Sequence, residues 1–354
     1  MVKKQKHLSL NACCMCMTEE GVWFVQGMCP ILYYYNFGAE RITIAEPLNI
    51  GETYGTAYFR EIYRKKDELY LVPNNSKKIA IYNITNKILE YVSVKDAIAN
   101  EYQNCYEYND ILYFIPYKAR QVIKLELDNH KIIQYIDIYE DKEENVCINS
   151  TCRMGNTIYC VLWNSSQILM IDLESETASQ LQTSGGHRFS QISTYEKNFL
   201  LYDMQEKALL IYEPNFEKIL RTIKVDYEDA MLIVGKEGEC VVDSAVSNEI
   251  LIMNDEFRRE KRIEFYVCNQ LMDTQPWTIN AWSLDKDRFI WGISTNGYLF
   301  KVIAESQKLE KKELVISEKL YSELNKKLIQ IDGNNIVMER TGFALENFLN
   351  SLNY

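Results

Sequence analysis

The sequence has 354 residues, of which 47% are hydrophobic and 25% are charged. This composition excludes a disordered chain and supplies enough apolar side chains for a large core. The formal net charge of −11 excludes nucleic acid as an expected partner, because such binding depends on lysine and arginine side chains that neutralise phosphates. Runs of about 18 apolar residues do not occur, so no membrane-spanning helix is expected.

The first residues of the chain lack the features of an export signal. Only a few apolar residues separate Lys6 from Cys13, whereas the apolar part of a signal peptide needs roughly 7–15 residues. We therefore expect a cytoplasmic protein, and the lipobox-like Leu10-Asn11-Ala12-Cys13 leaves lipoprotein export as the alternative. Thiols stay reduced in the cytoplasm, so the 10 cysteines are expected to be reduced and buried rather than paired in disulfides.

A short apolar segment recurs along nearly the whole chain. Its copies start between 41 and 49 residues apart, which matches the roughly 40–50 residues of a four-stranded propeller blade. In chain order they are VWFVQG from Val22, LYLVPN from Leu69, LYFIPY from Leu112, IYCVLW from Ile158, FLLYDM from Phe199, CVVDSA from Cys240 and FIWGIS from Phe289.

Each repeat unit is expected to contain four strands. A strand-like segment precedes each apolar copy from the second onward, and two segments of alternating apolar and polar residues follow it after short polar turns. The continuous apolar strand is expected to be buried on both faces between neighbouring sheets, and the two alternating strands to lie nearer the solvent. An isolated sheet of this size cannot bury both faces, so the units must stack.

On these residues the chain resembles the β-propeller superfamily, and its rhythm is most similar to kelch-like and other degenerate bacterial propellers. The resemblance covers about residues 8–317. It lacks a WD dipeptide, a kelch double glycine and other family signatures, so it indicates an architecture and no particular family. It implies an all-β fold of seven four-stranded blades, with six or eight blades as alternatives, a central channel, and functional loops on one face.

The sequence pattern changes after residue 317. Leu320, Leu324 and Leu328 have the spacing of a helix stripe, which predicts a helix over residues 318–329, and residues 341–354 form a second candidate helix. We expect a propeller over residues 1–317 and a C-terminal helical extension over residues 318–354 that packs on it. The alternative is a docking helix for a partner.

Residue patterns of catalytic and metal sites are not found. The chain has three histidines, and the cysteines at positions 13, 14 and 16 lack the paired CxxC spacing of a zinc site. Neither a Gly-x-Ser-x-Gly motif nor a phosphate-binding glycine loop occurs. We therefore expect no catalytic residue, no metal and no cofactor.

The mouth of the channel is the expected ligand site. The candidate residues mix aromatic rings with opposite charges, and they are Tyr58, Arg60, Tyr106, Glu107, Arg153, His187, Arg188, Asp229 and Trp277. Rings stack on apolar faces while charges fix orientation, which suits a sugar or a peptide. His187 follows Gly185 and Gly186 in the most glycine-rich loop. Structural filling of the channel is the alternative role of these side chains.

The favoured function is a non-catalytic binding scaffold that recognises a protein, glycan or peptide ligand through the loop face. The first alternative is a propeller-type lyase or hydrolase acting on a polar, carbohydrate-like substrate in the channel. It would use His187 and Arg188 with Glu107 or Asp229 as acid–base groups, so a carboxylate within hydrogen-bond reach of His187 would favour it. The second alternative is a structural subunit held by its C-terminal helix.

Overall fold

The computed structural model describes residues 5–7, 12–27, 30–48, 58–95, 101–138, 147–225, 230–234, 240–244, 249–253, 259–264, 279–284, 290–294, 297–303 and 308–332. The chain divides into two compact units. Unit 1 contains residues 1–96, 279–303 and 308–354, and unit 2 contains residues 97–278 and 304–307.

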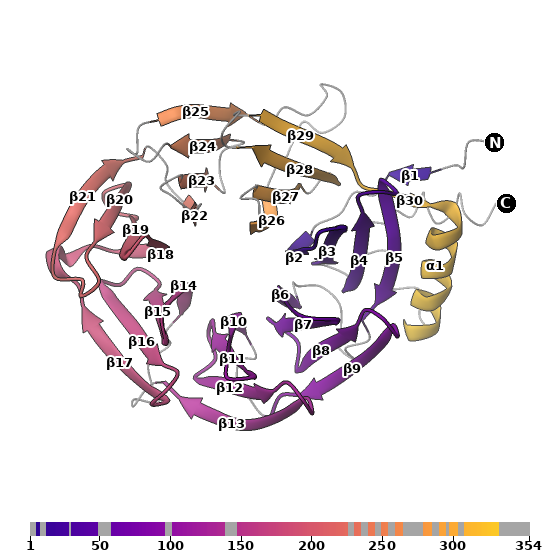
Figure 1. Cartoon of the computed structure of the whole chain (residues 1–354), viewed down its shortest axis with the longest axis horizontal. Helices are drawn as coiled ribbons and strands as arrows, with labels where there is room; N and C mark the ends of the chain where they lie inside the picture. Colours follow the sequence, from indigo (N-terminus) through magenta and orange to yellow (C-terminus); the bar gives the residue numbers. More distant parts are fainter. Residues whose placement is uncertain are drawn as a thin grey trace. The chain divides into compact units, whose positions relative to one another are not determined.

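Within the described residues, the strands form seven sheets, in which strands that follow one another in the sequence pair antiparallel (Figure 1). Unit 1 holds three of them. The six-stranded sheet has β2 (Ala12–Met17), β3 (Gly21–Gln26), β4 (Ile31–Asn36) and β5 (Arg41–Pro47), extended by β30 (Val315–Ser317) and β1 (Gln5–His7). The other two have β6 (Phe59–Lys65), β7 (Glu68–Pro73), β8 (Lys78–Asn83) and β9 (Ile88–Ser93), and β26 (Ile279–Leu284), β27 (Ile290–Ser294), β28 (Tyr298–Ile303) and β29 (Lys308–Glu313).

Unit 2 holds four sheets of four strands each. The first two have β10 (Tyr102–Tyr108), β11 (Ile111–Pro116), β12 (Gln121–Glu126) and β13 (Lys131–Asp137), and β14 (Ile148–Met154), β15 (Thr157–Leu162), β16 (Gln167–Asp172) and β17 (Thr177–Gln182). The last two have β18 (Phe189–Tyr195), β19 (Asn198–Asp203), β20 (Ala208–Tyr212) and β21 (Ile219–Lys224), and β22 (Ala230–Val234), β23 (Cys240–Ser244), β24 (Glu249–Met253) and β25 (Arg259–Glu264).

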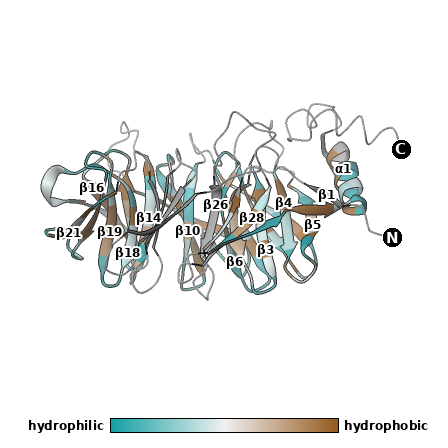
Figure 2. Ribbon diagram, turned by 90° about the horizontal axis from the view of Figure 1, so that it is seen from above, coloured by the Kyte–Doolittle hydropathy of each residue, from teal (hydrophilic) through white to brown (hydrophobic). Residues whose placement is uncertain are grey.

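The core lies between the faces of consecutive sheets within each unit. One hydrophobic cluster joins Trp23 and Val25 of β3 to Leu69 and Leu71 of β7. Another joins the β14–β17 sheet to the β18–β21 sheet, where the Phe199 and Phe216 rings stack 4.5 Å apart. In Figure 2 the hydrophobic colour lies within the strands and the hydrophilic colour at the turns between them. The predicted four-stranded repeat and the stacking of its units are therefore confirmed, and the closure into one seven-bladed ring stays a prediction.

The burial of individual strands agrees with the sequence pattern except in third strands whose burial the structure describes. Residues 69–72 of β7 and 112–115 of β11 are buried, as the continuous apolar runs predict, and the fourth strands β9 and β13 are largely exposed. The expectation that the third strand lies near the solvent is wrong, because β8, β12 and β20 are also buried. The third strand lies between two paired strands, so it does not form an edge of its sheet.

The chain passes one edge of four of the described sheets in the same way. A backbone amide just after the second strand donates to the carbonyl just before the first strand. The pairs are Asn74 to Tyr58 (2.8 Å), Tyr117 to Glu101 (2.7 Å), Trp163 to Cys147 (2.8 Å) and Met204 to Arg188 (2.9 Å). We call this edge, at which the first strand begins and the second ends, the loop edge.

The C-terminal segment covers the outer side of the six-stranded sheet in unit 1. Strand β30 pairs with β5 through Ile316 and Ile42, and β1 pairs with β30. Helix α1 (Glu318–Asp332) then packs on β5 through its buried side chains Tyr321, Leu324 and Leu328 (Figure 1). The first helix predicted for the tail is confirmed at this position, and the second candidate helix, over residues 341–354, lies outside the described residues. Among the described residues, helix α1 is too short and too polar to cross a membrane.

Candidate functional site

The first strands of three sheets in unit 2 lie side by side and run in the same direction. Each carries a β-bulge after its first residue, and in β10 and β14 the side chain in the bulge donates to the next sheet. Gln103 donates from Nε2 to the Asn149 carbonyl (2.8 Å), and Asn149 donates from Nδ2 to the Ser190 carbonyl (2.6 Å). Since a bulge leaves its own carbonyl outside the strand ladder, these side chains satisfy the groups that the bulges release. The loop edges of the three sheets therefore face the same side.

The expected ligand residues of unit 2 divide between the two ends of these strands. His187 and Arg188 come just before β18 and lie at the loop edge. Tyr106 and Glu107 near the end of β10, and Arg153 near the end of β14, lie at the opposite edge. The structure thus brings His187 and Arg188 together, and it separates them from the other three residues.

At the edge opposite the loop edge, the side chains are engaged in packing between strands. Arg153 donates from Nη1 to the Glu107 carbonyl and from Nε to the Gly155 carbonyl (2.8 Å), and its guanidinium lies over the Tyr108 ring. The hydroxyl of Tyr106 lies 2.8 Å from that of Thr151. These contacts join the β10–β13 sheet to the β14–β17 sheet.

The remaining expected residues lie elsewhere. Tyr58 of unit 1 is buried in the hydrophobic cluster between the six-stranded sheet and the β6–β9 sheet. Arg60 occupies the bulge of β6 and is half-buried. Asp229 and Trp277 are outside the described residues.

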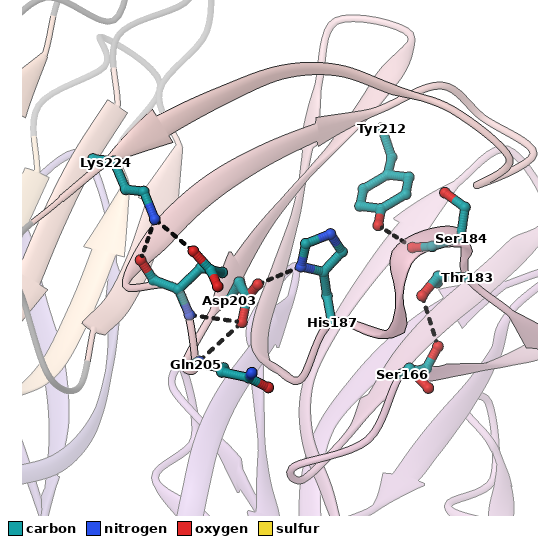
Figure 3. A network of polar contacts seen from close by, with 9 residues as sticks. Ser166, Thr183, Ser184, His187, Asp203, Gln205, Tyr212 and Lys224 are labelled. Atoms are coloured by element: carbon teal, nitrogen blue, oxygen red, sulfur yellow. Dashed lines mark hydrogen bonds and ion pairs between the residues drawn. The ribbon is translucent and has the colours of Figure 1, made fainter.

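A histidine–carboxylate pair lies at the loop edge of the β18–β21 sheet (Figure 3). Nδ1 of His187 is 2.5 Å from Oδ2 of Asp203, whose side chain is fully buried, whereas the histidine side chain is 20% exposed. Oδ1 of Asp203 accepts from the backbone amides of Gln205 (2.9 Å) and Glu206 (3.3 Å). The carboxylate therefore fixes both the imidazole and the turn that follows β19.

The glycine-rich loop is built around the imidazole. Residues Ser184–Gly186 form a short 3-10 turn in which Gly185 has φ 88° and Gly186 has φ 67°. A Cβ atom on Gly185 would lie 2.7 Å from Nε2 of His187, so glycine allows the backbone to pass close to the ring. The Tyr212 hydroxyl donates to the Ser184 carbonyl (2.8 Å) and anchors the loop from β20 (Figure 3).

We expect the substitution Gly185→Ala to destabilise the protein by about 2 kcal/mol, because it adds backbone strain and displaces His187 from Asp203. Urea unfolding measures this effect. Gly186→Ala is the matched control, since its φ is also positive but no atom lies within 4 Å of an added Cβ. It should cost about 1 kcal/mol from backbone strain. Equal losses for the two variants would show that the imidazole contact does not matter.

An exposed tryptophan lies at the loop edge of the preceding sheet. Trp163 and Asn164 form the turn after β15, which the Ser165 amide closes on the Leu162 carbonyl (3.2 Å), and Trp163 is 45% exposed. The neighbouring sheet holds this turn in place, because the Phe189 amide donates to the Ser165 carbonyl (3.1 Å).

Arg188 reaches the same turn from the start of the next sheet. Its Nη1 donates to Oδ1 of Asn164 (3.4 Å), so the side chains of two sheets meet at the loop edge. We call Trp163, Asn164, His187 and Arg188 the loop patch.

Sequence reasoning missed three of the residues at this edge. Trp163 ends the apolar run IYCVLW and was counted as part of the strand, although its place after the strand is that of a turn residue. Asn164 follows it in the same turn. Asp203 is the carboxylate at the end of FLLYD, and a charge in a buried run was the available signal. Its pairing with His187 depends on the register that places Phe189 opposite Asp203.

Two of the described cysteines are held in the thiol form by burial. Burial raises the pKa of Cys16 to about 11 and that of Cys152 to about 12, so both thiols are protonated and unreactive at neutral pH. In the part of the chain that the structure describes, no three His, Cys, Asp or Glu side chains are grouped so as to hold a metal ion.

Comparisons with known proteins show the fold. No family model matches the sequence, and no curated protein matches it. Among solved structures, virginiamycin B lyase from Staphylococcus aureus is similar with a TM-score of 0.64 and 12% identity, over 88% of this chain and 98% of that chain. A catalytically inactive form of that lyase with quinupristin gives the same values.

Two further solved structures are similar. YCF48 bound to D1 peptide has a TM-score of 0.62 and 10% identity, over 84% of this chain and 94% of that chain. PorZ, a surface component of the type-IX secretion system of Porphyromonas gingivalis, has a TM-score of 0.58 and 10% identity, over 89% of this chain and 40% of that chain. These neighbours are β-propeller proteins, and the chain has the β-propeller fold.

Proposed function

We propose that this chain is a non-catalytic binding scaffold that recognises a protein or peptide ligand, with a glycan as the alternative, through the loop patch. The observation that carries the proposal is the exposure of Trp163 at the tip of a turn that two sheets hold in place. Tryptophan and arginine are the residue types that contribute most to binding when a partner buries them. A tryptophan that is 45% exposed has a large apolar area available for this purpose.

The rigidity of the patch supports the same proposal. Hydrogen bonds fix the backbone of Arg188 and the turn at Asn164, and Asp203 fixes the ring of His187. Binding to a preorganised surface loses little conformational entropy, so more of the contact energy becomes affinity. Peptide binding is compatible with the fold, since the similar structure of YCF48 contains a D1 peptide.

We expect Trp163→Ala to weaken ligand binding at least 30-fold. This is the loss expected when an interface residue contributes about 2 kcal/mol to the free energy of binding. Peptides are first selected from a displayed random library on the wild-type protein, and their dissociation constants are measured by fluorescence anisotropy. Ile133→Ala is the matched control, because Ile133 is 48% exposed on the outer strand β13, and its binding should be unchanged. Peptides that bind the Trp163 variant as tightly as the wild type would refute the proposal.

A second candidate function is an enzyme of the lyase or hydrolase class acting on a polar, carbohydrate-like substrate. The observation that favours it is the hydrogen bond between His187 and Asp203, since a carboxylate on Nδ1 leaves Nε2 as the basic nitrogen. Glu107 lies at the opposite strand ends and does not join this pair. Release of reducing ends or unsaturated products from a polysaccharide panel, and its loss in His187→Gln, would establish this function instead.

The cellular setting and the division of the chain belong to the same proposal. We propose a cytoplasmic bacterial protein, which is supported by seven described cysteines that are free thiols. We also propose that residues 1–317 form the propeller and residues 318–354 its C-terminal extension. This division is supported by helix α1, which begins at Glu318 and packs on β5.

A further inference from the structure

The loop patch contains a positive charge that no carboxylate of the described residues neutralises. The Arg188 side chain is exposed, and the one contact that its guanidinium makes with the described part of the chain is with the neutral amide of Asn164. Two acidic residues of β19 and the turn that follows it are engaged elsewhere. The buried carboxylate of Asp203 is hydrogen-bonded to His187 and to two backbone amides. Glu206 forms an ion pair with Lys224 (2.7 Å).

One hydrogen bond links this guanidinium to the turn that carries the exposed ring. The Arg188 carbonyl accepts from the Met204 amide (2.9 Å), and the next residue, Phe189, donates to Ser165. Asn164 orients the side chain toward the turn that carries Trp163, and adjacent Cα atoms are about 3.8 Å apart. An anionic group and an apolar group of one ligand would therefore be held close together.

We infer that the ligand of the loop patch is an acidic peptide segment, which presents a carboxylate to Arg188 and an apolar side chain to Trp163. This inference rests on the proposed binding function. A guanidinium binds a carboxylate through two parallel hydrogen bonds, and several of its five N–H groups are available here. The net charge of −11 would repel acidic segments from most of the surface, so binding depends on this local positive charge.

A carboxylate fits this site better than a phosphate group. Recognition of phosphorylated segments relies on clusters of arginines, whereas the loop patch as described has one arginine. The other basic side chain, His187, directs Nδ1 to Asp203 and has its own carboxylate partner. A singly charged group is thus sufficient to neutralise the patch.

The test uses the indole N–H signal of Trp163 in the NMR spectrum of the full chain, assigned with Trp163→Phe. Two pools of hexapeptides are titrated: one has Asp or Glu at a fixed central position, and the other has Asn or Gln there. We expect the acidic pool to shift the signal at a concentration at least tenfold lower than the amide pool. Arg188→Gln should remove this difference, and Arg188→Lys should retain part of it.

The outcomes separate this inference from the proposal on which it rests. Arg221→Gln is the control for loss of one positive charge, because Arg221 is exposed on β21 of the same sheet, and it should leave the difference intact. If both pools shift Trp163 equally, the carboxylate inference is wrong and binding at the loop patch stands. If neither pool shifts Trp163, both are wrong.

Discussion

Replacing Asp203 by alanine is expected to lower the free energy of unfolding by about 3 kcal/mol. The fully buried carboxylate accepts three hydrogen bonds, from His187 and from the amides of Gln205 and Glu206. Its removal leaves these donors without an acceptor, and hydrogen bonds to a charged group contribute about 1.5–3 kcal/mol each. Urea unfolding followed by circular dichroism measures the loss.

Asp203→Asn is the matched variant for this prediction. Its amide oxygen can accept from the two backbone amides, and its amide nitrogen can donate to His187 in the other tautomer. We expect a loss of about 1 kcal/mol for this change. If the alanine variant were as stable as the wild type, the carboxylate would not be the group that fixes the loop.

The ion pair between Lys124 and Glu176 should respond very differently to the loss of either partner. Lys124 of β12 pairs with Glu176 of the neighbouring sheet, and its ammonium group also donates to Gln134 (3.0 Å) and lies over the Tyr113 ring. The lysine side chain is 7% exposed and the glutamate side chain 32%. Glu176→Gln leaves a buried charge without its counter-ion, and we expect it to cost about 3 kcal/mol.

Lys124→Met is the matched variant. It places an apolar side chain of similar length in the buried position, and Glu176 can turn to the solvent, so we expect a change of less than about 1 kcal/mol. Thermal and urea unfolding of the two variants compare these values. A larger loss for the methionine variant than for the glutamine variant would contradict this account of the pair.

The repeat was predictable from the sequence because strand burial is a local property. A continuous apolar run such as residues 112–115 of β11 needs cover on both faces, and its recurrence at blade-length intervals required stacked units. Helix α1 was predictable for the same reason, since the stripe of Leu320, Leu324 and Leu328 needs one apolar face.

The burial of the third strands was not predictable from alternation alone. The alternating pattern of β12 predicts that Lys124 faces the solvent. It is nevertheless buried, because a carboxylate from another sheet pairs with it. That carboxylate is 52 residues away in the sequence. Local patterns contain no information on such a partner.

The same division applies to the candidate site. By itself the sequence determined the four-stranded repeat, the buried second strands, the C-terminal helix and the glycine-rich loop at His187, because each depends on residues close together in the chain. Only the tertiary structure decided that His187 meets Asp203, that Arg188 meets Asn164, and that Glu107 and Arg153 lie at the opposite edge. These pairings depend on strand register, on the bulges, and on how one sheet packs against the next, which local residue patterns do not specify.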